Sequence, residues 1–447
     1  MNEHIENALE QFRNQSARYR RSNRYYAGRH DLSFATEKFA NTFGDLFREF
    51  ALNLCPAVVD AVRDKLRIRG FGIQRIGARR PEPPAEAAAD IHASIDRIWR
   101  GNRMAIRAGE VHKEALKNGD AYLIVWPGDG GIRMFPNSAE SCTVHYNENE
   151  PGRIDWAAKY WRDCDRRTRL NLFFADRVEK YRSTRQSDGF LPEAKDLVPM
   201  ASEADADGGG EVMENPYGIV PVFHFANNAD IGSFGRSELE PVMPIQDGLN
   251  KSVLDMLVAM EVCAFRQRWA AGIEIQIDEA TGKEVSPFNA GVDRLWVASN
   301  ADARFGDLGA ADLEQFLKVK DGFRLDIASV TGTPLHYLMP QMRGFRSGES
   351  LRKAEARFIA KVRDRQELFG SVWADAVTFA LRASGWGEVA VTADWEDPAP
   401  ISEREALENL RLKRELGISA EQVLKEAGYG DVDIREMRKV DERRESK

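Results

Sequence analysis

The sequence holds 447 residues, of which 43% are hydrophobic and 30% are charged, and its formal net charge is −8. This composition is typical of a globular chain with about two to four domains and a sizeable core. The negative charge excludes a protein that grips nucleic acid over a large basic surface, because such binding depends on neutralising phosphates. It does not exclude a protein past which nucleic acid slides without sticking.

Cysteine usage and hydropathy indicate the compartment. The four cysteines are scattered without a paired framework, which fits a reducing environment: Cys55, Cys142, Cys164 and Cys263. The first 21 residues lack the apolar core of a signal peptide. The longest apolar stretches, 121–126 and 253–265, are too short or too charged to span a bilayer. We therefore expect an intracellular, soluble protein with no membrane partner.

The first 117 residues are predicted to be mainly helical. Apolar residues at helical spacing predict four helices, at 3–20, 45–66, 90–99 and 104–117. Pro56 should kink the second of these helices or split it after Asn53. A turn is expected at 25–30, a strand at 67–73, and a proline-rich connector at 79–86.

The next hundred residues are predicted to be mainly strands. Short apolar runs separated by turn signals predict strands at 121–126, 132–135, 142–146, 154–161, 169–174 and 177–182. An α+β block with a mostly antiparallel sheet is the expected arrangement. From 183 to 216 the composition shifts to Asp, Glu, Ala and Gly, which predicts a mobile loop. After this loop, residues 219–225 are expected to be ordered again.

A small module is predicted to interrupt two helices in the second half of the chain. A helix is expected over 237–268, despite Pro241 and Pro244, and another over 312–329. Between them, residues 273–277 and 294–297 predict two strands separated by turns.

A constrained break then leads into a long helix. Pro334 and Pro340 exclude continuous helix from about 332 to 348. Helix restarts with Ser347 or Ser350 as a possible N-cap. Its apolar stripe consists of Leu351, Ala354, Phe358, Val362, Phe369, Val372, Trp373, Ala376 and Phe379 or Ala380. A helix of about 45 Å is either the spine of a scaffold or an ordinary long amphipathic helix. A strand within 386–395 and helices at 402–416 and 420–427 complete the chain.

Patterns that would indicate catalysis are missing. The sequence has no phosphate-binding loop, no dinucleotide fingerprint and no nucleophile elbow. In the nearest resemblance to an elbow, 344–348, Ser347 stands one place late and no strand precedes it. The sequence therefore favours a structural or binding protein with no catalytic residue and no cofactor.

Two kinds of metal site are possible on residue type alone. Cys142, His145 and Cys164 are possible zinc ligands, but a fourth ligand is not evident, and residues three apart on a strand point to opposite faces. Carboxylate pairs could hold Mg²⁺ as a nuclease requires: Asp163/Asp165, Asp205/Asp207 and Asp431/Asp433. Each pair lies in a predicted turn or loop among other charges, which favours solvated surface and no metal.

Several segments, taken together and in order, resemble the portal proteins of tailed bacteriophages, specifically the SPP1-type group common in phages and prophages of actinobacteria. The segments are Tyr25-Tyr26-Ala27-Gly28-Arg29-His30, Asn53-Leu54-Cys55-Pro56-Ala57-Val58-Val59-Asp60, Arg69-Gly70-Phe71, Gly119-Asp120-Ala121-Tyr122, Gly235-Arg236-Ser237-Glu238-Leu239, Pro244-Ile245-Gln246-Asp247-Gly248-Leu249-Asn250-Lys251, Thr331-Gly332-Thr333-Pro334 and Ser347-Gly348-Glu349-Ser350-Leu351. The set covers most of residues 20–370.

The resemblance implies an α+β portal fold with a wing, a stem, a clip and a crown. Its parts would be 1–236 (wing, with a mobile loop near 183–216), 237–270 (stem helix), 271–311 (clip), 312–330 (second stem helix), 331–348 (channel loop), 349–396 (spine helix and following strand) and 397–447 (crown).

The resemblance also implies a non-enzymatic ring, usually of about twelve subunits, at the portal vertex of the virion and assembled in the host cytoplasm. Double-stranded DNA would enter through the ring, driven by the large subunit of terminase, and later leave through it. Further implied partners are the major capsid protein, the scaffold and head–tail adaptors. Two alternatives remain: a metal-dependent nuclease using His145 and scattered carboxylates, or another ring-forming head–tail connector.

The channel loop is the implied nucleic-acid site. Its candidate residues are Gln341, Met342, Arg343, Gly344, Phe345 and Arg346. These side chains would touch DNA without reading its bases, and an acidic subunit with a few positive groups at the constriction suits sliding. Alternatively, the two arginines pair with acidic residues of the adjacent subunit.

Overall fold

The computed structural model describes residues 3–31, 34, 52–73, 85–128, 130–187, 191–200, 212–264, 268–272, 276–277, 284–285, 302–307, 313–339, 348–387, 389–399, 403–420, 423–424 and 427. The chain divides into two compact units. One comprises residues 1–20, 59–238 and 332–447, and the other comprises residues 21–58 and 239–331. The fold is mixed α+β, as the sequence predicts.

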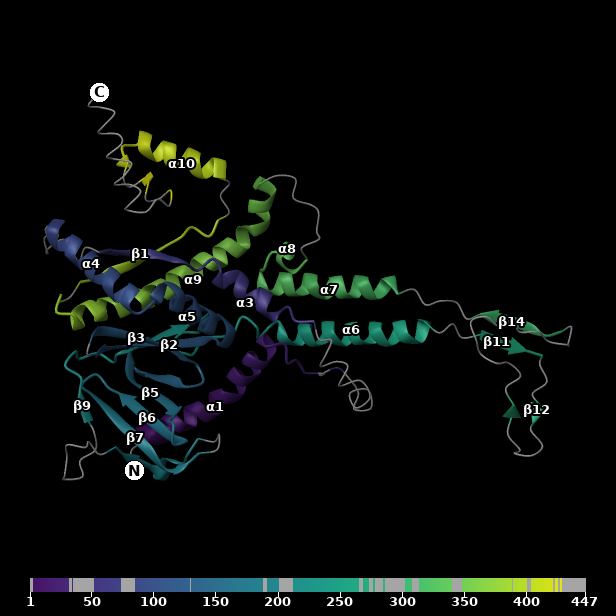
Figure 1. Cartoon of the computed structure of the whole chain (residues 1–447), viewed down its shortest axis with the longest axis horizontal. Helices are drawn as coiled ribbons and strands as arrows, with labels where there is room; N and C mark the ends of the chain where they lie inside the picture. The colour runs from purple at the N-terminus through teal and green to yellow at the C-terminus, as the bar shows by residue number, and fades with distance from the viewer. Residues whose placement is uncertain are drawn as a thin grey trace. The chain divides into compact units, whose positions relative to one another are not determined.

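A six-stranded antiparallel sheet forms one layer of the first unit (Figure 1). Its strands are β4 (Cys142–Tyr146), β5 (Ile154–Arg162), β6 (Arg167–Phe173), β7 (Arg177–Gln186), β8 (Leu197–Pro199) and β9 (Val212–Glu214), and both β8 and β9 pair with β7. One face of the sheet packs against α1 (Glu3–Tyr26), whose Ile5, Leu9 and Phe12 contact a core that includes Trp156 and Leu170. Alternating burial along the strands gives the sheet its second apolar face.

The prediction of a mobile loop over 183–216 is wrong for the parts that the structure describes. Strand β7 continues to Gln186, the short helix η1 (Ala194–Asp196) follows, and β8 and β9 pair with β7. Leu197 is buried in the core under α1. Residues 188–190 and 201–211 lie outside the described residues.

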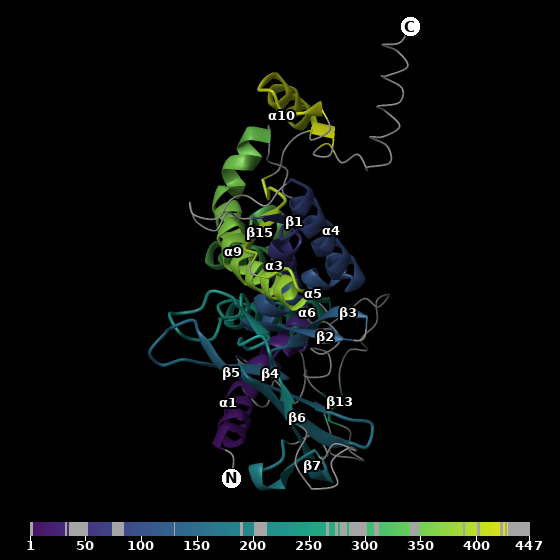
Figure 2. The ribbon, with the colours of Figure 1, turned by 90° about the vertical axis from the view of Figure 1, so that its left-hand side faces the viewer.

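A three-stranded sheet forms the next layer. Its order is β10 (Val222–Ala226), β2 (Asp120–Gly128) and β3 (Gly131–Ser138), all antiparallel. One face, through Tyr122 and Ile124, shares a core with β4, β6 and β7 of the larger sheet. Helices α4 (Ala85–Gly101), α5 (Met104–Asn118) and α9 (Gly348–Ala383) lie on the other side (Figure 2). Strand β2 is therefore buried on both faces, which explains its continuous apolar run.

Helix α9 has 36 residues, which corresponds to about 54 Å, longer than expected. Its predicted stripe is buried from Phe358 to Ala380, with only Val372 half-buried; the side chains of 348–352 are not described. Gly370 lets the ring of Trp395 approach, since a Cβ there would lie 3.0 Å from the indole nitrogen. Trp395 ends β15 (Val391–Trp395), which pairs with β1 (Ile68–Ile73).

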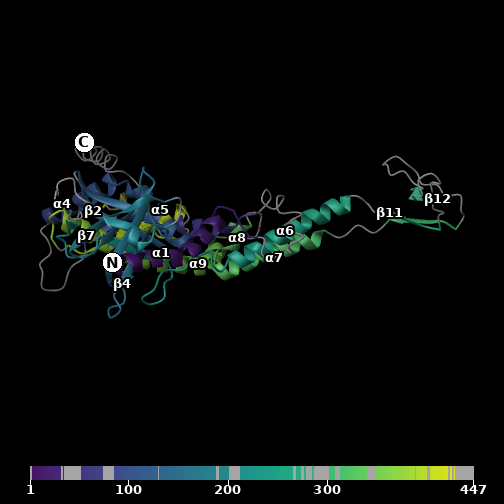
Figure 3. The same ribbon diagram turned by 90° about the horizontal axis from the view of Figure 1, so that it is seen from below.

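The second unit contains two helices that run side by side, α6 (Met243–Ala264) and α7 (Glu314–Thr331) (Figure 3). Gly248 of α6 contacts Phe323 of α7 so closely that a Cβ would lie 3.0 Å from the ring. Between the helices, β11 (Arg268–Ala271) pairs with β14 (Arg304–Asp307), and β12 (Gln276–Ile277) pairs with β13 (Glu284–Val285). The predicted helix–small module–helix order is confirmed.

Several predicted boundaries in this unit are wrong. The helix expected over 237–268 begins at Met243, so that Pro244 occupies its first turn, where a missing N–H costs nothing. Arg268, the last residue of the predicted helix, instead begins the strand β11. Of the strand expected at 273–277, residues 276–277 form β12, whereas 273–275 and the strand expected at 294–297 lie outside the described residues.

Other boundaries shift by one or two turns. Helix α1 continues to Tyr26, so the two tyrosines expected in a turn are helical. Residues 52–54 are not helical and α3 (Cys55–Arg63) begins after them, so the helix expected over 45–66 is not continuous; residues 45–51 lie outside the described part. A short helix, α8 (Leu335–Leu338), occurs within the predicted break. Helix α10 (Glu403–Glu415) matches its prediction closely. Among described residues, no helix is long and apolar enough to cross a membrane.

Candidate functional site

The predicted channel-loop residues are not among those that the structure describes. Gln341, Met342, Arg343, Gly344, Phe345 and Arg346 all fall in the segment 340–347. The described chain enters this segment from α8, after Met339, and leaves it at Gly348, where α9 begins. The loop therefore stays a prediction.

The possible zinc ligands do not come together. Cys142 is buried at the start of β4, whereas Cys164 is exposed in the turn between β5 and β6. His145 stacks on Trp156, on the sheet face that packs against α1, whereas Cys142 belongs to the core on the opposite face. The predicted opposition of these two side chains is thus confirmed. No group of three metal-ligating side chains converges within the described residues.

The carboxylates of Asp163 and Asp165 are occupied by arginines. Asp163 accepts a bond of 2.9 Å from Nε of Arg169 and lies 3.3 Å from Nε of Arg182. Arg182 also binds Asp165. These contacts join the β5–β6 turn to neighbouring strands and leave no arrangement suited to Mg²⁺. The pairs Asp205/Asp207 and Asp431/Asp433 lie outside the described residues.

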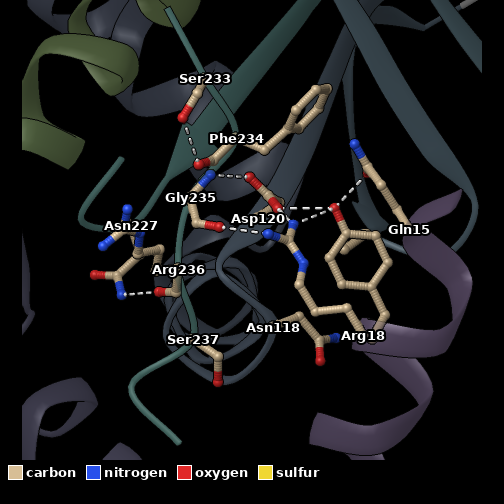
Figure 4. A network of polar contacts seen from close by, with 12 residues as sticks. Gln15, Arg18, Asn118, Asp120, Asn227, Ser233, Phe234, Gly235, Arg236 and Ser237 are labelled. Carbon is tan, nitrogen blue, oxygen red and sulfur yellow. Dashed lines mark hydrogen bonds and ion pairs between the residues drawn. The ribbon is translucent and has the colours of Figure 1, made fainter. Parts of the chain in front are cut away.

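A buried polar network instead surrounds Asp120, at the start of β2 (Figure 4). The Asp120 carboxylate is fully buried and accepts hydrogen bonds from Arg18 (2.7 Å) and Tyr19 (2.8 Å) of α1. It also accepts one from the backbone N–H of Gly235 (2.7 Å). Burial raises the pKa of the Tyr19 phenol, and the Asp120 charge raises it further, so Tyr19 remains a donor.

His224 extends this network toward the smaller core. Its Nε2 lies 2.8 Å from Asp120, and its Nδ1 lies 2.6 Å from the hydroxyl of Tyr146. Because a carboxylate only accepts, Nε2 carries a proton and donates to Asp120, and Nδ1 shares the second hydrogen bond with the Tyr146 hydroxyl. Tyr122 stacks on the imidazole, with ring centroids 4.6 Å apart. The network contains the carboxylate, imidazole and hydroxyl groups that a proton relay would use. Because it is buried among core side chains, its role is to join α1, β2, β4 and β10.

Two of the segments that carry the family resemblance cross at this network. The N–H of Asn227 donates to the carbonyl of Gly119, and the N–H of Arg236 donates to the carbonyl of Asn227. Gly119 has φ of 96°, which favours glycine. The crossing fixes the chain just before it continues into α6.

The same segment is held by the long helix. Glu238 accepts a hydrogen bond of 2.6 Å from Lys361 and one of 3.2 Å from Arg365, both on α9. Burial alone would raise the pKa of Glu238, but the two cations and Asn227 lower it below its ordinary value. A buried carboxylate shared by two cations thus joins residue 238 to α9.

Three further resemblance segments meet inside the second unit. Asp247 of α6 accepts hydrogen bonds of 2.7 and 2.9 Å from the hydroxyl of Tyr25. Gln246 accepts from the N–H of Leu54 and donates to the carbonyl of Leu52. Asn53 and Asn250 both contact His30, at 3.2 and 3.0 Å. These contacts fasten the first half of α6 to residues 25–54.

The helix pair leaves apolar side chains exposed. Large hydrophobic residues of α6 and α7 that are between 47% and 55% exposed are Met260, Leu317, Val319, Leu325 and Val330. Between Glu314 and Thr331 only Ile327, Ala328 and Thr331 are buried. Because these apolar side chains of α6 and α7 are about half exposed, the helix pair presents an apolar surface, and such surfaces mark interaction sites.

Sequence reasoning did not identify these networks. From the sequence alone, a charged residue is expected at the surface, and its burial becomes evident only when its partners are known. One available signal is the run Val222–Ala226, in which His224 stands among apolar residues that predict a buried strand. Another is the presence of Asp120, Glu238 and Asp247 within the resemblance segments.

Comparison with known proteins identifies the family. A family model described as phage portal protein, SPP1 Gp6-like, matches residues 84–447. The portal protein of Mycobacterium phage D29 is 28% identical over 409 residues, covering 86% of this chain and 77% of the relative. The portal protein of Mycobacterium phage L5 is 28% identical over 405 residues, with the same coverage.

Solved structures also align with most of the chain. A chain in the neck of an empty gene transfer agent particle aligns with a TM-score of 0.48 and 13% identity, covering 83% of this chain and 87% of that one. A chain in the neck of the native particle aligns with a TM-score of 0.43 and 11% identity, covering 82% and 86%. The match of the family model over most of the sequence is decisive, and the chain belongs to the phage portal proteins of the SPP1 Gp6-like family.

Proposed function

We propose that copies of this chain close into a ring of about twelve subunits at one vertex of a phage capsid. The ring is a conduit through which double-stranded DNA enters during packaging and leaves during ejection. The observation that carries this proposal is the family match over residues 84–447, together with two relatives that are named portal proteins. The chain acts as a structural component of the virion and not as an enzyme.

The α6–α7 pair supports assembly into a ring. Val319 and Val330 lie eleven residues apart, which is close to three helical turns, so they share one side of α7. Both are about half exposed in the single chain. A second copy of the same helix pair would remove these side chains from water. In a heterologous arrangement each copy offers one surface to the next, and such contacts close into rings.

The parts of the chain take the roles that the family resemblance assigns. Residues 1–236 form the wing, the helices within 237–270 and 312–330 form the stem, and residues 271–311 form the clip. The clip is the docking site for the large subunit of terminase and later for head–tail adaptors. Residues 349–396 supply the spine helix and 397–447 the crown. The major capsid protein and the scaffold are further partners of the ring during assembly.

The segment 331–348 lines the narrowest part of the tunnel. It joins α7 to α9, the end of the stem to the spine. Arg343 and Arg346 supply a few positive charges in a subunit whose net charge is −8. Such a distribution lets a phosphate backbone pass without strong binding.

Particle size and shape test the ring. Purified full-length protein should form annular particles with a central hole in negative-stain images, and mass photometry should give a mass close to twelve times 50.4 kDa. The nuclease alternative predicts a small particle that cuts DNA in the presence of Mg²⁺. A well-folded chain that stays monomeric at micromolar concentration would overturn the proposal.

A further inference from the structure

A concave site on the first unit is lined by three arginines, and none of the described residues that line it is a carboxylate. Its cavity volume is about 500 Å³. The lining residues come from α1, from the end of β5 and the start of β6, and from the segment after β7: Arg13, Ser16, Arg20, Tyr160, Trp161, Arg162, Thr168, Ser187 and Leu191. We call this site the arginine pocket. It lies on the layer formed by the six-stranded sheet and α1, and none of its residues belongs to the predicted channel loop.

Helical and strand geometry bring the three guanidinium groups to one place. Arg13 and Arg20 are seven residues apart on α1, which is about two turns, so they lie on the same side of the helix. Arg162 is the last residue of β5 and pairs across the β5–β6 ladder with Thr168. The pocket thus collects three positive charges from two elements that are distant in sequence.

These charges have little internal compensation. The side chains of Arg20 and Arg162 form no hydrogen bond or ion pair with a described residue, and that of Arg13 donates to the carbonyl oxygen of Pro192 at 3.0 Å. The carboxylate of Glu193 is paired with Lys195, at 2.6 Å, and also attracts Arg13. The carboxylate of Glu140 acts, together with Arg20, on the pocket residue Tyr160. Three like charges around one concavity repel one another, and an anion bound between them would relieve that repulsion.

The remaining lining groups suit a phosphate. The hydroxyls of Thr168 and Ser187 lie 3.0 Å apart, so one can donate to the other while the second proton stays available. Planar guanidinium groups bind phosphate oxygens through paired N–H donors. Tyr160, whose ring packs edge to face against Phe12 of α1, provides an aromatic wall beside the charges.

We propose that the arginine pocket binds phosphate groups, with Arg13, Arg20 and Arg162 as the ligating side chains. The phosphates come either from the backbone of duplex DNA or from a free polyphosphate anion, and both sources present the same tetrahedral oxygens.

Binding of two probes to the full-length protein tests this proposal. Isothermal titration calorimetry with pyrophosphate and fluorescence anisotropy with a labelled 20-base-pair duplex should each be run at low and moderate salt. We expect saturable binding of at least one probe. Binding of pyrophosphate alone assigns the site to a free anion, and binding of the duplex with a steep salt dependence assigns it to the DNA backbone.

Variants connect any binding to the pocket. Arg20→Gln and Arg162→Gln should each weaken binding about tenfold, because each removes a charge-assisted contact. Arg20→Lys should retain part of the affinity, since it keeps the charge but loses the paired donors. Arg133→Gln removes an exposed arginine of β3 that does not line the pocket, and it should bind like the wild type.

Two results would overturn the proposal. One is the absence of saturable binding by either probe in wild-type protein that is folded by circular dichroism. The other is equal affinity in the wild type, Arg20→Gln and Arg162→Gln. Because the chosen side chains are exposed on one surface of the unit, their replacement should leave the thermal unfolding temperature unchanged, which separates loss of binding from loss of fold.

Discussion

Gly235 crosses Gly119 so closely that a Cβ on Gly235 would lie 2.0 Å from the Gly119 carbonyl oxygen. It would also lie 2.5 Å from the backbone nitrogen of Asn227. All of these neighbours are backbone atoms, so no rotamer change can relieve the contact. We predict that Gly235→Ala lowers stability by about 3 kcal/mol or more, measured as a lower thermal unfolding temperature.

Gly109→Ala is the matched control for this substitution. Gly109 lies within α5, and a Cβ there meets no atom within 4 Å. Alanine should raise stability by about 0.5–1 kcal/mol, because glycine loses more conformational entropy in a helix. If Gly235→Ala unfolds at the wild-type temperature, the close crossing is wrong.

Local patterns in the sequence predict much of the fold. Alternating apolar residues between turn signals identify β4 to β7, and helical spacing identifies α5 and α9 with nearly correct ends. The failures share a physical cause, which is that partners distant in sequence decide the structure. Strands β8 and β9 have only three residues each, too few for an alternating pattern to be recognised, and they form because the edge of β7 offers hydrogen-bonding groups. Arg268, at the end of a helical pattern, instead begins β11, which pairs with β14.

The buried networks could not be predicted in the same way. Arg18 and Asp120 are 102 residues apart, and Glu238 and Arg365 are 127 apart. No spacing rule connects such residues, and a single sequence contains no record of which pairs vary together. The resemblance segments do contain Asp120, Glu238 and Asp247, so they mark the positions without showing their contacts.

The Glu238 junction predicts a loss of stability when its charge is removed. In Glu238→Gln, Lys361 and Arg365 lose the buried carboxylate that they share, so stability should fall by about 3 kcal/mol at pH 7. Thermal unfolding measures this loss. Glu150→Gln, which alters an exposed pair with Arg153, should leave the unfolding temperature unchanged. Equal behaviour of the two variants would contradict a structural role for Glu238.

The pH dependence of that loss has a definite sign. The folded-state pKa of Glu238 is lowered, so its contribution is fully present above the unfolded value of about 4.3 and disappears as pH falls through the folded value. The difference in stability between wild type and Glu238→Gln should therefore shrink below about pH 4. A difference that grows on acidification would show that the carboxylate is not stabilised by the two cations.

His112 predicts a second pH effect at higher pH. Its Nε2 accepts a hydrogen bond of 2.8 Å from the indole N–H of Trp373, and burial lowers its pKa to about 3. The unfolded chain takes up this proton near pH 6.5, so stability is full above that value and falls by up to about 1.4 kcal/mol per unit below it. Urea unfolding at several pH values between about 4.5 and 7.5 measures the slope.

A glutamine at position 112 separates this effect from other titrations. His112→Gln can still accept from Trp373 but does not titrate, so its slope between about pH 4.5 and 6.5 should be smaller. His92→Gln changes an exposed histidine of α4 and should retain the wild-type slope. An unchanged slope in His112→Gln would show that another group is responsible.

Assembly should depend on the exposed apolar side of α7. Val319→Glu and Val330→Glu place charges where a second copy would bury the valines, so each should lower the fraction of rings about tenfold at a fixed concentration. Mass photometry measures this fraction. Lys318→Glu changes an exposed residue of the same helix that already contacts solvent, and it should assemble more like the wild type. Rings that form normally from both valine variants would place the subunit contact elsewhere.

The channel loop is tested by packaging. Arg343→Ala and Arg346→Ala remove the positive charges of the segment 340–347. Loss of contact with phosphates should change either the length of the packaged DNA or the rate of packaging. Gel electrophoresis of DNA extracted from assembled particles measures the length. Arg414→Ala, at the end of α10, is the control for loss of one positive charge. If the arginines pair instead with a neighbouring subunit, the variants should weaken the ring itself in negative-stain images. Unchanged packaging by intact rings would remove the proposed contact with DNA.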